Sequence, residues 1–310
     1  MSSLTTTASL SSLMQKYYDR LFIDIAKHAL VHEQGAQMRP LPGGGGKIVY
    51  FTRYTPLAII TAQITEGSNP SAVNLSATTV SATVSEFGSY TTISKLLKLT
   101  SLDKGMEGAV EVMAQNAGES RDQMVRNKAL VGGTAQLAGG KAYMSLVSIT
   151  DVLSSTELRK ALRTLKANKA QRYDDGYFLG KIGPYSSYDM MGDTTWVNAH
   201  VYKDGENLYQ GEIGKIFGVR IIETTNPKET ANGGVSSADV QHSFVHGKNA
   251  IGVTDLEGDS QKVYVKTPGP NSTDNPVDRF STVGWALSFV PKQLVSDWVI
   301  EIKHGATGKT

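Results

Sequence analysis

The sequence contains no cysteine among its 310 residues. Disulfide bonds, thiolate metal sites and a cysteine nucleophile are therefore excluded, and the chain suits a reducing compartment. Met1–Ser12 has neither the basic region nor the apolar run of a secretory signal. No stretch approaches the ~20 apolar residues that span a membrane. We therefore expect a protein that folds without disulfides and without a membrane.

A large excess of charge of either sign is also lacking. The chain has 31 Lys and Arg residues against 29 Asp and Glu residues, which gives a formal net charge of +2. A protein whose main task is to grip nucleic acid usually carries a strong basic excess or a basic stripe. We therefore expect that this chain contacts nucleic acid only weakly and without sequence specificity.

Motifs of catalytic and phosphate-binding sites are missing as well. No Gly-x-Ser-x-Gly nucleophile elbow occurs. The sequence Gly308-Lys309-Thr310 lacks the first glycine of a phosphate loop, because position 303 is lysine. The glycines between Gly211 and Gly218 do not have dinucleotide-binding spacing and lead into a strand, which indicates a tight turn. We predict that the protein is not an enzyme and binds no cofactor.

Histidines and carboxylates do not form a recognisable metal motif. His28 and His32 have the four-residue spacing of helical metal ligands, but no third ligand accompanies them, so surface histidines are the commoner interpretation. His242 and His246 lie too far apart along a strand to share an ion. The acidic residues around Asp255 do not match a calcium loop and are expected in a solvated turn. We predict no metal site.

Periodicity divides the chain into helices and strands of an α+β protein. Apolar residues at helical spacing predict an amphipathic helix over about 11–34, ended by Gly35. A second helix, over about 103–131, would be ~40 Å long. Its glycines, Gly105, Gly108 and Gly118, suggest close packing against another backbone. A capping box begins a third helix at Ser154. Strands are expected over 177–182, 219–223, 282–290 and 297–303.

Two further β-rich segments predict a long hairpin. Residues 47–57 are rich in β-branched and aromatic side chains, and residues 78–90 alternate strictly between apolar and polar side chains. A hairpin of this kind is marginally stable alone, so it needs a partner surface. The helix over 11–34 also has more apolar surface than the short segment before it can cover, so it must dock either on the main body or on a neighbouring subunit. The residues we predict as contacts between subunits are Tyr17, Leu21, Phe22, Ile25, Phe51, Tyr54, Ile64, Glu66, Val80 and Val84.

Several segments carry a resemblance to a known family. They are Tyr17-Tyr18-Asp19-Arg20-Leu21-Phe22, Gly35-Ala36-Gln37, Gly46-Lys47, Phe51-Thr52-Arg53-Tyr54-Thr55-Pro56-Leu57, Thr65-Glu66-Gly67, the run from Thr83 to Tyr90, Ala117-Gly118-Glu119 and Gly211-Glu212-Ile213-Gly214 followed by Phe217-Gly218-Val219. In order and spacing they resemble the major capsid proteins related to that of coliphage N-four, a tailed bacteriophage.

The resemblance implies the fold of the phage Hong Kong 97 capsid subunit. It implies an N-terminal arm over 1–45, an extended β-hairpin loop over 46–100 and a peripheral domain formed by 101–144 and 276–310. The long helix over 103–131 would be the spine of that domain. An axial domain would occupy 145–275, and the last strands would return to the peripheral domain.

The function implied is a major capsid protein that forms hexamers and pentamers of an icosahedral head shell around double-stranded DNA. Portal, scaffolding and decoration proteins are implied partners, with assembly in the host bacterial cytoplasm and residence in the virion. An encapsulin-type nanocompartment shell, which encloses a cargo protein, is the alternative. An ordinary α/β enzyme is a third reading, and no candidate pocket in the sequence favours it.

Overall fold

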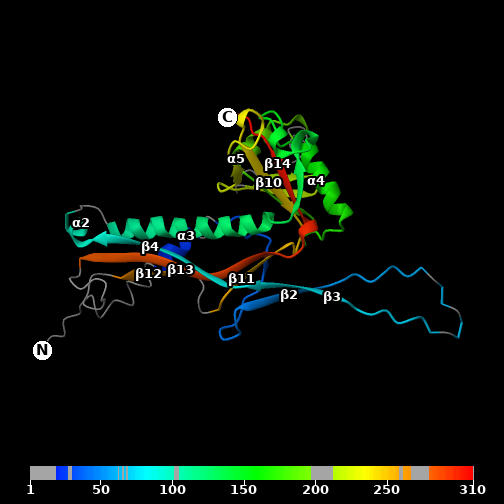
Figure 1. The fold of residues 1–310 in the computed structure, drawn as a ribbon, viewed down its shortest axis with the longest axis horizontal. Coiled ribbons are helices and arrows are strands. Elements are labelled where there is room, and N and C mark those ends of the chain that lie inside the picture. The colour runs from blue at the N-terminus through cyan, green and yellow to red at the C-terminus, as the bar shows by residue number, and fades with distance from the viewer. Residues whose placement is uncertain are drawn as a thin grey trace.

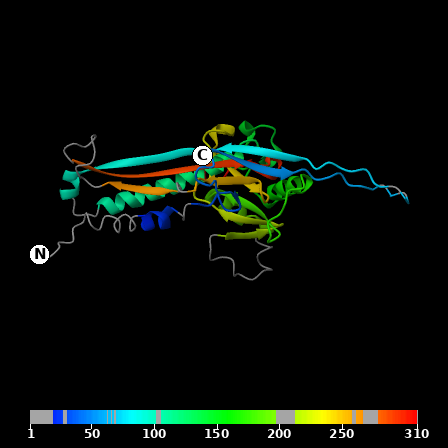
Figure 2. The same cartoon turned by 90° about the horizontal axis from the view of Figure 1, so that it is seen from below.

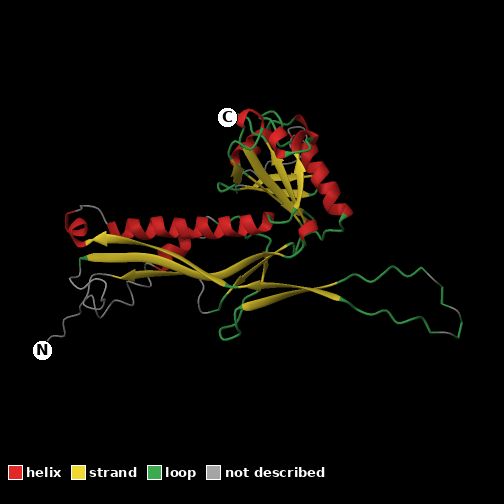
Figure 3. Cartoon of the chain, in the orientation of Figure 1, coloured by secondary structure: helices red, strands yellow, loops and turns green. Residues whose placement is uncertain are grey.

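The structure is a computed structural model that describes residues 19–26, 30–61, 63–64, 66–67, 69–100, 105–196, 212–257, 261–266 and 279–309. These residues form an elongated part, a compact part and a projecting hairpin (Figure 1). Helices and strands are mixed within both parts (Figure 3), so the α+β prediction is confirmed. None of the helices described is both long and apolar enough to cross a membrane.

The elongated part is a five-stranded sheet with a long helix along one face. Its strands are β1 (Gln37–Met38), β4 (Ser85–Ser94), β11 (Ile251–Asp255), β12 (Lys262–Lys266) and β13 (Phe280–Gln293), and its helices are α2 (Lys95–Thr100) and α3 (Gly105–Leu130). The strand β13 pairs with β4 over ten residues and also with β11 and β12. It is therefore the central strand of this part.

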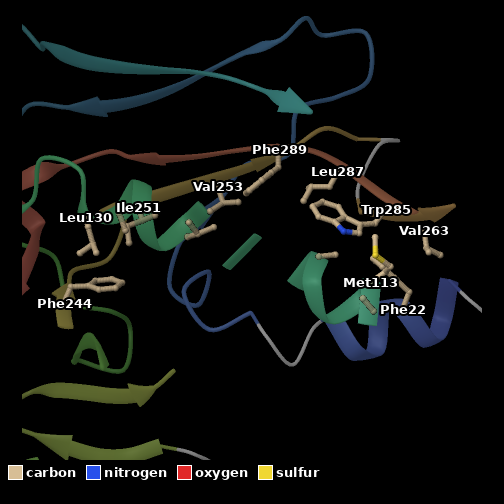
Figure 4. Packing of buried hydrophobic residues seen from close by; sticks show 14 of the residues in the cluster. Phe22, Met113, Leu130, Phe244, Ile251, Val253, Val263, Trp285, Leu287 and Phe289 are labelled. Atoms are coloured by element: carbon tan, nitrogen blue, oxygen red, sulfur yellow. The ribbon is translucent and has the colours of Figure 1, made fainter. Parts of the chain in front are cut away.

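The long helix α3 confirms the predicted spine. Its 26 residues span about 39 Å at 1.5 Å per residue. Its buried face packs on Trp285, Leu287 and Phe289 of β13 (Figure 4), and the Trp285 indole donates a hydrogen bond of 3.1 Å to Asn116 Oδ1. The close backbone packing expected at Gly108 is wrong, since a Cβ there would meet nothing within 4 Å.

The predicted N-terminal helix does not extend to residue 34, and its predicted first residues, 11–18, lie outside the described residues. It is helical over residues 19–26, but the chain forms a turn over residues 32–35, where Gly35 has φ of +81°. The extension to residue 34 is therefore wrong. Phe22 is buried in the same core as Trp285, with Leu21 and Ile25 packed beside it. The helix packs these side chains on the body of its own chain, which is the first of the two docking partners expected for it.

The predicted strand over 78–90 is two strands. Its first half is β3 (Ala77–Thr83), which pairs antiparallel with β2 (Ile48–Tyr54) to form the hairpin. Its second half is β4, which belongs to the elongated sheet. Val84 separates the two strands, and its amide donates to the Lys47 carbonyl. The alternating pattern continues across this break, so it does not reveal the change of sheet.

The compact part is a seven-stranded sheet in the order β5-β14-β10-β6-β8-β7, with β9 paired to β10. Its elements are β5 (Thr134–Leu137), α4 (Ser155–Ala167), β6 (Phe178–Ile182), α5 (Pro184–Met191), β7 (Glu212–Ile216), β8 (Val219–Glu223), β9 (Lys228–Thr230), β10 (Val240–His246) and β14 (Val299–His304). The predicted helix start is confirmed, because the Ser154 side chain accepts from the Glu157 amide at the start of α4. The carboxylate of Glu157 accepts from Gln136 and Lys160, so the reciprocal half of the capping box is wrong.

Strand pairing corrects the boundaries that the resemblance implied. The last strand, β14, lies in the compact sheet between β5 and β10, although it was expected in the peripheral domain. The strands β11 and β12 fall in the range expected for the axial domain but belong to the elongated sheet. The parts are therefore interleaved along the chain, which crosses between them repeatedly. Local patterns carry no information about such long-range pairing.

The root of the hairpin is anchored on the elongated part. Val49 and Phe51 are buried with Leu41, Ala82 and Val84. A Cβ on Gly252 would lie 2.9 Å from the Phe51 ring, so only glycine lets the ring approach β11 this closely. The Arg53 guanidinium lies 5.1 Å from the centre of the Trp298 ring. These contacts fix the direction in which the hairpin leaves the body.

We predict that Phe51→Ala lowers the free energy of unfolding by about 3 kcal/mol, because it opens a cavity at the buried root. Tyr54→Ala, three residues along the same strand, is a matched control, since Tyr54 is exposed and its removal should cost less than about 0.5 kcal/mol. Urea unfolding of both variants measures the difference. Equal losses would contradict the anchoring role of Phe51.

Buried histidines predict that acid lowers the stability of the chain. Burial lowers the pKa of His32, lowers the pKa of His246 well below 6.5 and lowers the pKa of His304 to about 4. As the pH falls below 6.5, the unfolded chain binds protons at these rings and the folded chain does not. The free energy of unfolding should therefore fall towards pH 4, by about 3 kcal/mol from His304 alone.

Urea titrations of the unassembled chain at several pH values between about 7 and about 4 measure this loss. His304→Gln removes one of the three groups and should reduce the dependence of stability on pH. The imidazole Nε2 of His304 lies 2.9 Å from Ser243 Oγ, so the glutamine amide can replace part of that contact. The same pH dependence in the variant and the parent chain would refute the contribution of His304.

Candidate assembly surface

The hairpin projects beyond the rest of the described chain in two perpendicular views (Figures 1 and 2). Its strands pair in register from Ile48 opposite Thr83 to Tyr54 opposite Ala77. One further hydrogen bond, of 2.9 Å from the Thr55 amide to the Ser76 carbonyl, closes the ladder. Beyond it, the described residues between 56 and 75 form no helix or strand. We refer to residues 55–76 as the hairpin tip.

The hairpin tip exposes large apolar side chains. Ile59 is 87% exposed and Ile64 is 69% exposed. The other large apolar side chains that the tip exposes are Leu57, Ile60, Val73 and Leu75. Burial of an apolar side chain of this size in a second surface stabilises a contact by about 2 kcal/mol. Exposed apolar patches of this kind mark interaction surfaces in soluble proteins.

The charge of the tip also suits burial. Residues 55–76 contain one ionisable side chain, Glu66. Placing this segment against another surface therefore removes few charges from water, and the cost of desolvation is small. The polar residues of the tip are mainly Thr, Ser, Asn and Gln, which can form hydrogen bonds with a partner. The tip thus combines apolar anchors with neutral polar groups, as the centres of protein interfaces do.

A shallow hollow on the elongated sheet is a second candidate surface. It lies over β4, β12 and β13 and is lined by Tyr90, Tyr264 and Thr282, among others. Tyr90 is 74% exposed. A Cβ on Gly284 would lie 2.8 Å from the Tyr90 Cβ, so the glycine makes room for the aromatic ring beside it. The hollow offers aromatic surface on a rigid sheet.

The predicted contact residues that the structure describes fall into exposed, buried and partly buried groups. Tyr54, Ile64 and Glu66 are exposed on the hairpin, where a neighbour can reach them. Phe22, Phe51 and Val84 are buried inside their own chain, so their assignment to a subunit contact is wrong. Leu21 and Ile25 are partly buried on the same core as Phe22, and Val80 is half-buried on β3. Tyr17 lies outside the described residues.

The predicted list of contact residues omits the most exposed apolar residues of the tip, Ile59 and Ile60, although the loop over 59–72 was expected to act in assembly. The segment has no helical or alternating period, so the pattern does not single out individual side chains. The usable signal was the combination of adjacent isoleucines with flanking prolines, Pro56 and Pro70, and almost no charge. Loops with that composition are unusual, because most connections between elements are polar.

The histidines and carboxylates also differ from expectation. His32 is buried and its Nδ1 lies 2.6 Å from Asp122 Oδ2, so the prediction of a surface residue is wrong. Asp255 was expected in a solvated turn, but it ends β11 and accepts from the Arg121 guanidinium at 2.9 Å. His28 lies outside the described residues. In the part of the chain that the structure covers, no cluster of three metal-ligating side chains occurs.

Comparison with known proteins identifies the fold. No family model matches the sequence, and no curated protein matches it. Among solved structures, the capsid of Ralstonia phage GP4 superposes with a TM-score of 0.69 at 13% identity, over 88% of this chain and 87% of that one. The capsid of cyanophage P-SCSP1u superposes with a TM-score of 0.66 at 16% identity, over 90% of this chain and 89% of that one.

A virus-like particle from Pyrococcus furiosus is also similar, with a TM-score of 0.53 at 10% identity over 93% of this chain and 99% of that chain. In each of these three comparisons the likeness extends over nearly the whole of both chains. The hairpin, the long helix and the two sheets of this chain all fall within the range that these likenesses cover. The chain has the Hong Kong 97 capsid fold.

Proposed function

We propose that this chain is a shell-forming subunit, the major capsid protein of a tailed bacteriophage head. One observation carries the proposal, namely the anchored hairpin whose tip exposes apolar side chains with almost no charge. An exposed surface of this kind is an aggregation hazard unless a partner covers it. The fold shared with phage capsid chains supports a second copy of the same chain as that partner.

The finer proposal is that copies associate as hexamers and pentamers, which close into an icosahedral shell around double-stranded DNA. Contact with DNA is weak and non-specific, in keeping with the formal net charge of +2. In this proposal the subunit acts as a structural component and not as an enzyme, assembles in the host bacterial cytoplasm and resides in the virion. The quoted segments favour membership of the coliphage N-four family, with portal, scaffolding and decoration proteins as further partners.

We predict that Ile60→Asp blocks assembly and leaves folding intact. The side chain is 71% exposed in the single chain, so a carboxylate there costs the folded monomer little. Loss of one buried isoleucine weakens a subunit contact by about 2 kcal/mol, which raises the concentration needed for assembly about 30-fold. Light scattering and electron microscopy measure assembly, and circular dichroism measures folding.

The matched control for that variant is Ser71→Asp, which adds the same charge to the same tip at a polar and exposed position. It should assemble with a much smaller defect than Ile60→Asp. Equal behaviour of the two variants would mean that charge, and not the apolar anchor, decides the outcome. Normal shells from Ile60→Asp would refute the assembly role of the tip.

An encapsulin-type shell around a cargo protein is the alternative, favoured by the similarity to the Pyrococcus particle. The two proposals differ in what the shell encloses. We expect particles made in a phage-infected host to protect double-stranded DNA from added nuclease, while the alternative predicts an enclosed protein and no protected DNA. Nuclease treatment followed by gel analysis of opened particles decides between them. Particles that hold one stoichiometric foreign protein would favour the alternative.

A further inference from the structure

A buried cluster of charged and polar groups lies where the elongated and compact parts meet. At its centre is the segment from Val31 to Gly35, which follows the N-terminal helix. The amides of Val31 and His32 donate to Asp122 Oδ1 of α3 at 2.9 and 2.6 Å. His32 Nδ1 lies 2.6 Å from the other Asp122 oxygen. One fully buried carboxylate of the elongated part therefore binds three groups of the segment.

The compact part holds the same segment from the opposite side. Lys181 of β6 is completely buried, and its Nζ donates to the carbonyls of His32 and Gln34 at 2.5 and 2.9 Å. The hydroxyl of Tyr173 donates to the Gly35 carbonyl at 2.7 Å. A Cβ on Gly35 would lie 2.6 Å from that hydroxyl, so the turn fits closely against the compact part. Burial lowers the pKa of Lys181 to about 7.

An aromatic stack extends the contact into the compact sheet. The His32 ring stacks on Phe244 of β10 with a centroid distance of 5.7 Å, and Phe244 stacks on His246 at 5.8 Å. On the other side, Glu33 accepts two hydrogen bonds from Arg121 of α3, at 3.0 and 2.5 Å. The same segment is thus bound to α3 on one side and to the compact part on the other.

One covalent connection between the two parts is a short glycine turn. The chain passes from α3 to β5 through Gly132 and Gly133, and Gly132 has φ of +79°. A few loop residues of this kind are enough to absorb a rotation between packed units. The guanidinium of Arg126 makes a direct bond between the parts, since it donates to the carbonyls of Asn226 and Pro227 at 2.7 and 2.8 Å.

We propose that residues 31–35 are a latch that sets the angle between the elongated and compact parts. A force or a binding event on the chain N-terminal to Val31 is then transmitted to the compact part through the latch. The benefit of such a device rests on the proposed shell function. Hexamers and pentamers place the same chain in different surroundings, so the subunit needs an angle that is defined and yet adjustable.

The latch can be tested in single chains, independently of assembly. Because the chain has no cysteine, Glu111→Cys on α3 and Ala167→Cys on α4, both exposed, provide one spin label on each part. Labelled chains diluted into an excess of unlabelled chains report the distance between the parts by pulsed electron spin resonance. We expect one narrow distribution of distances in the labelled chain without further changes. The distribution should be broader or shifted when Lys181→Met or Asp122→Asn is added.

Asp122→Asn is included in case Lys181→Met does not fold, because asparagine keeps the shape of the aspartate side chain and one of its acceptor oxygens. Hydrogen exchange at the Val31 and His32 amides should be at least about tenfold faster in it, as expected when a hydrogen bond loses its charged acceptor. Lys292→Met, which changes an exposed lysine of β13, is the matched control and should alter neither readout.

Two outcomes would overturn the latch. One is a broad distribution in the parent background, which would mean that the angle is not fixed. The other is an unchanged distribution in folded Asp122→Asn together with a broadened one in Arg126→Met, which would place the restraint on Arg126. Shells that fail to form, with the distances as expected, would count against the shell function and not against the latch.

Discussion

The packing of α3 on β13 is the interaction on which the rest of the structure depends. The strand supplies Trp285, Leu287 and Phe289 to the helix and at the same time pairs with β4, β11 and β12. Because a packed helix and a paired sheet stiffen each other, this layer can extend in one direction without a large globular core. The N-terminal helix, the hairpin root and the compact part are all positioned by contact with it.

That rigid layer explains why the hairpin tip can expose apolar surface without loss of order at its base. Phe51 is held against Gly252 of β11, and Arg53 lies against the Trp298 ring, so the first seven residue pairs have fixed positions. The exposed tip begins where those contacts end. A surface presented on a rigid base loses little conformational entropy when it binds, which favours association between identical chains.

Local signals in the sequence predicted local structure well. The helix start at Ser154 and the long helix α3 depend on neighbours within a few residues, and the sequence predicts both. The place of β14 beside β5 and that of β4 beside β13 depend on pairing partners more than 100 residues away in the chain. The change of sheet at Val84 leaves no mark in the sequence, because the alternation of apolar and polar residues continues through it. The alternation of apolar and polar residues indicates which face of a strand is buried, but it does not indicate which strand pairs with it.

The candidate contact residues illustrate the same limit at the level of single side chains. Phe22 and Phe51 are apolar and have no partner nearby in sequence, yet Phe22 packs on the α3 and β13 core and Phe51 packs against β11. Apolar character predicts burial without naming the surface that provides it. Only the three-dimensional arrangement distinguishes residues that are already covered within the chain from Ile59 and Ile64, which stay exposed.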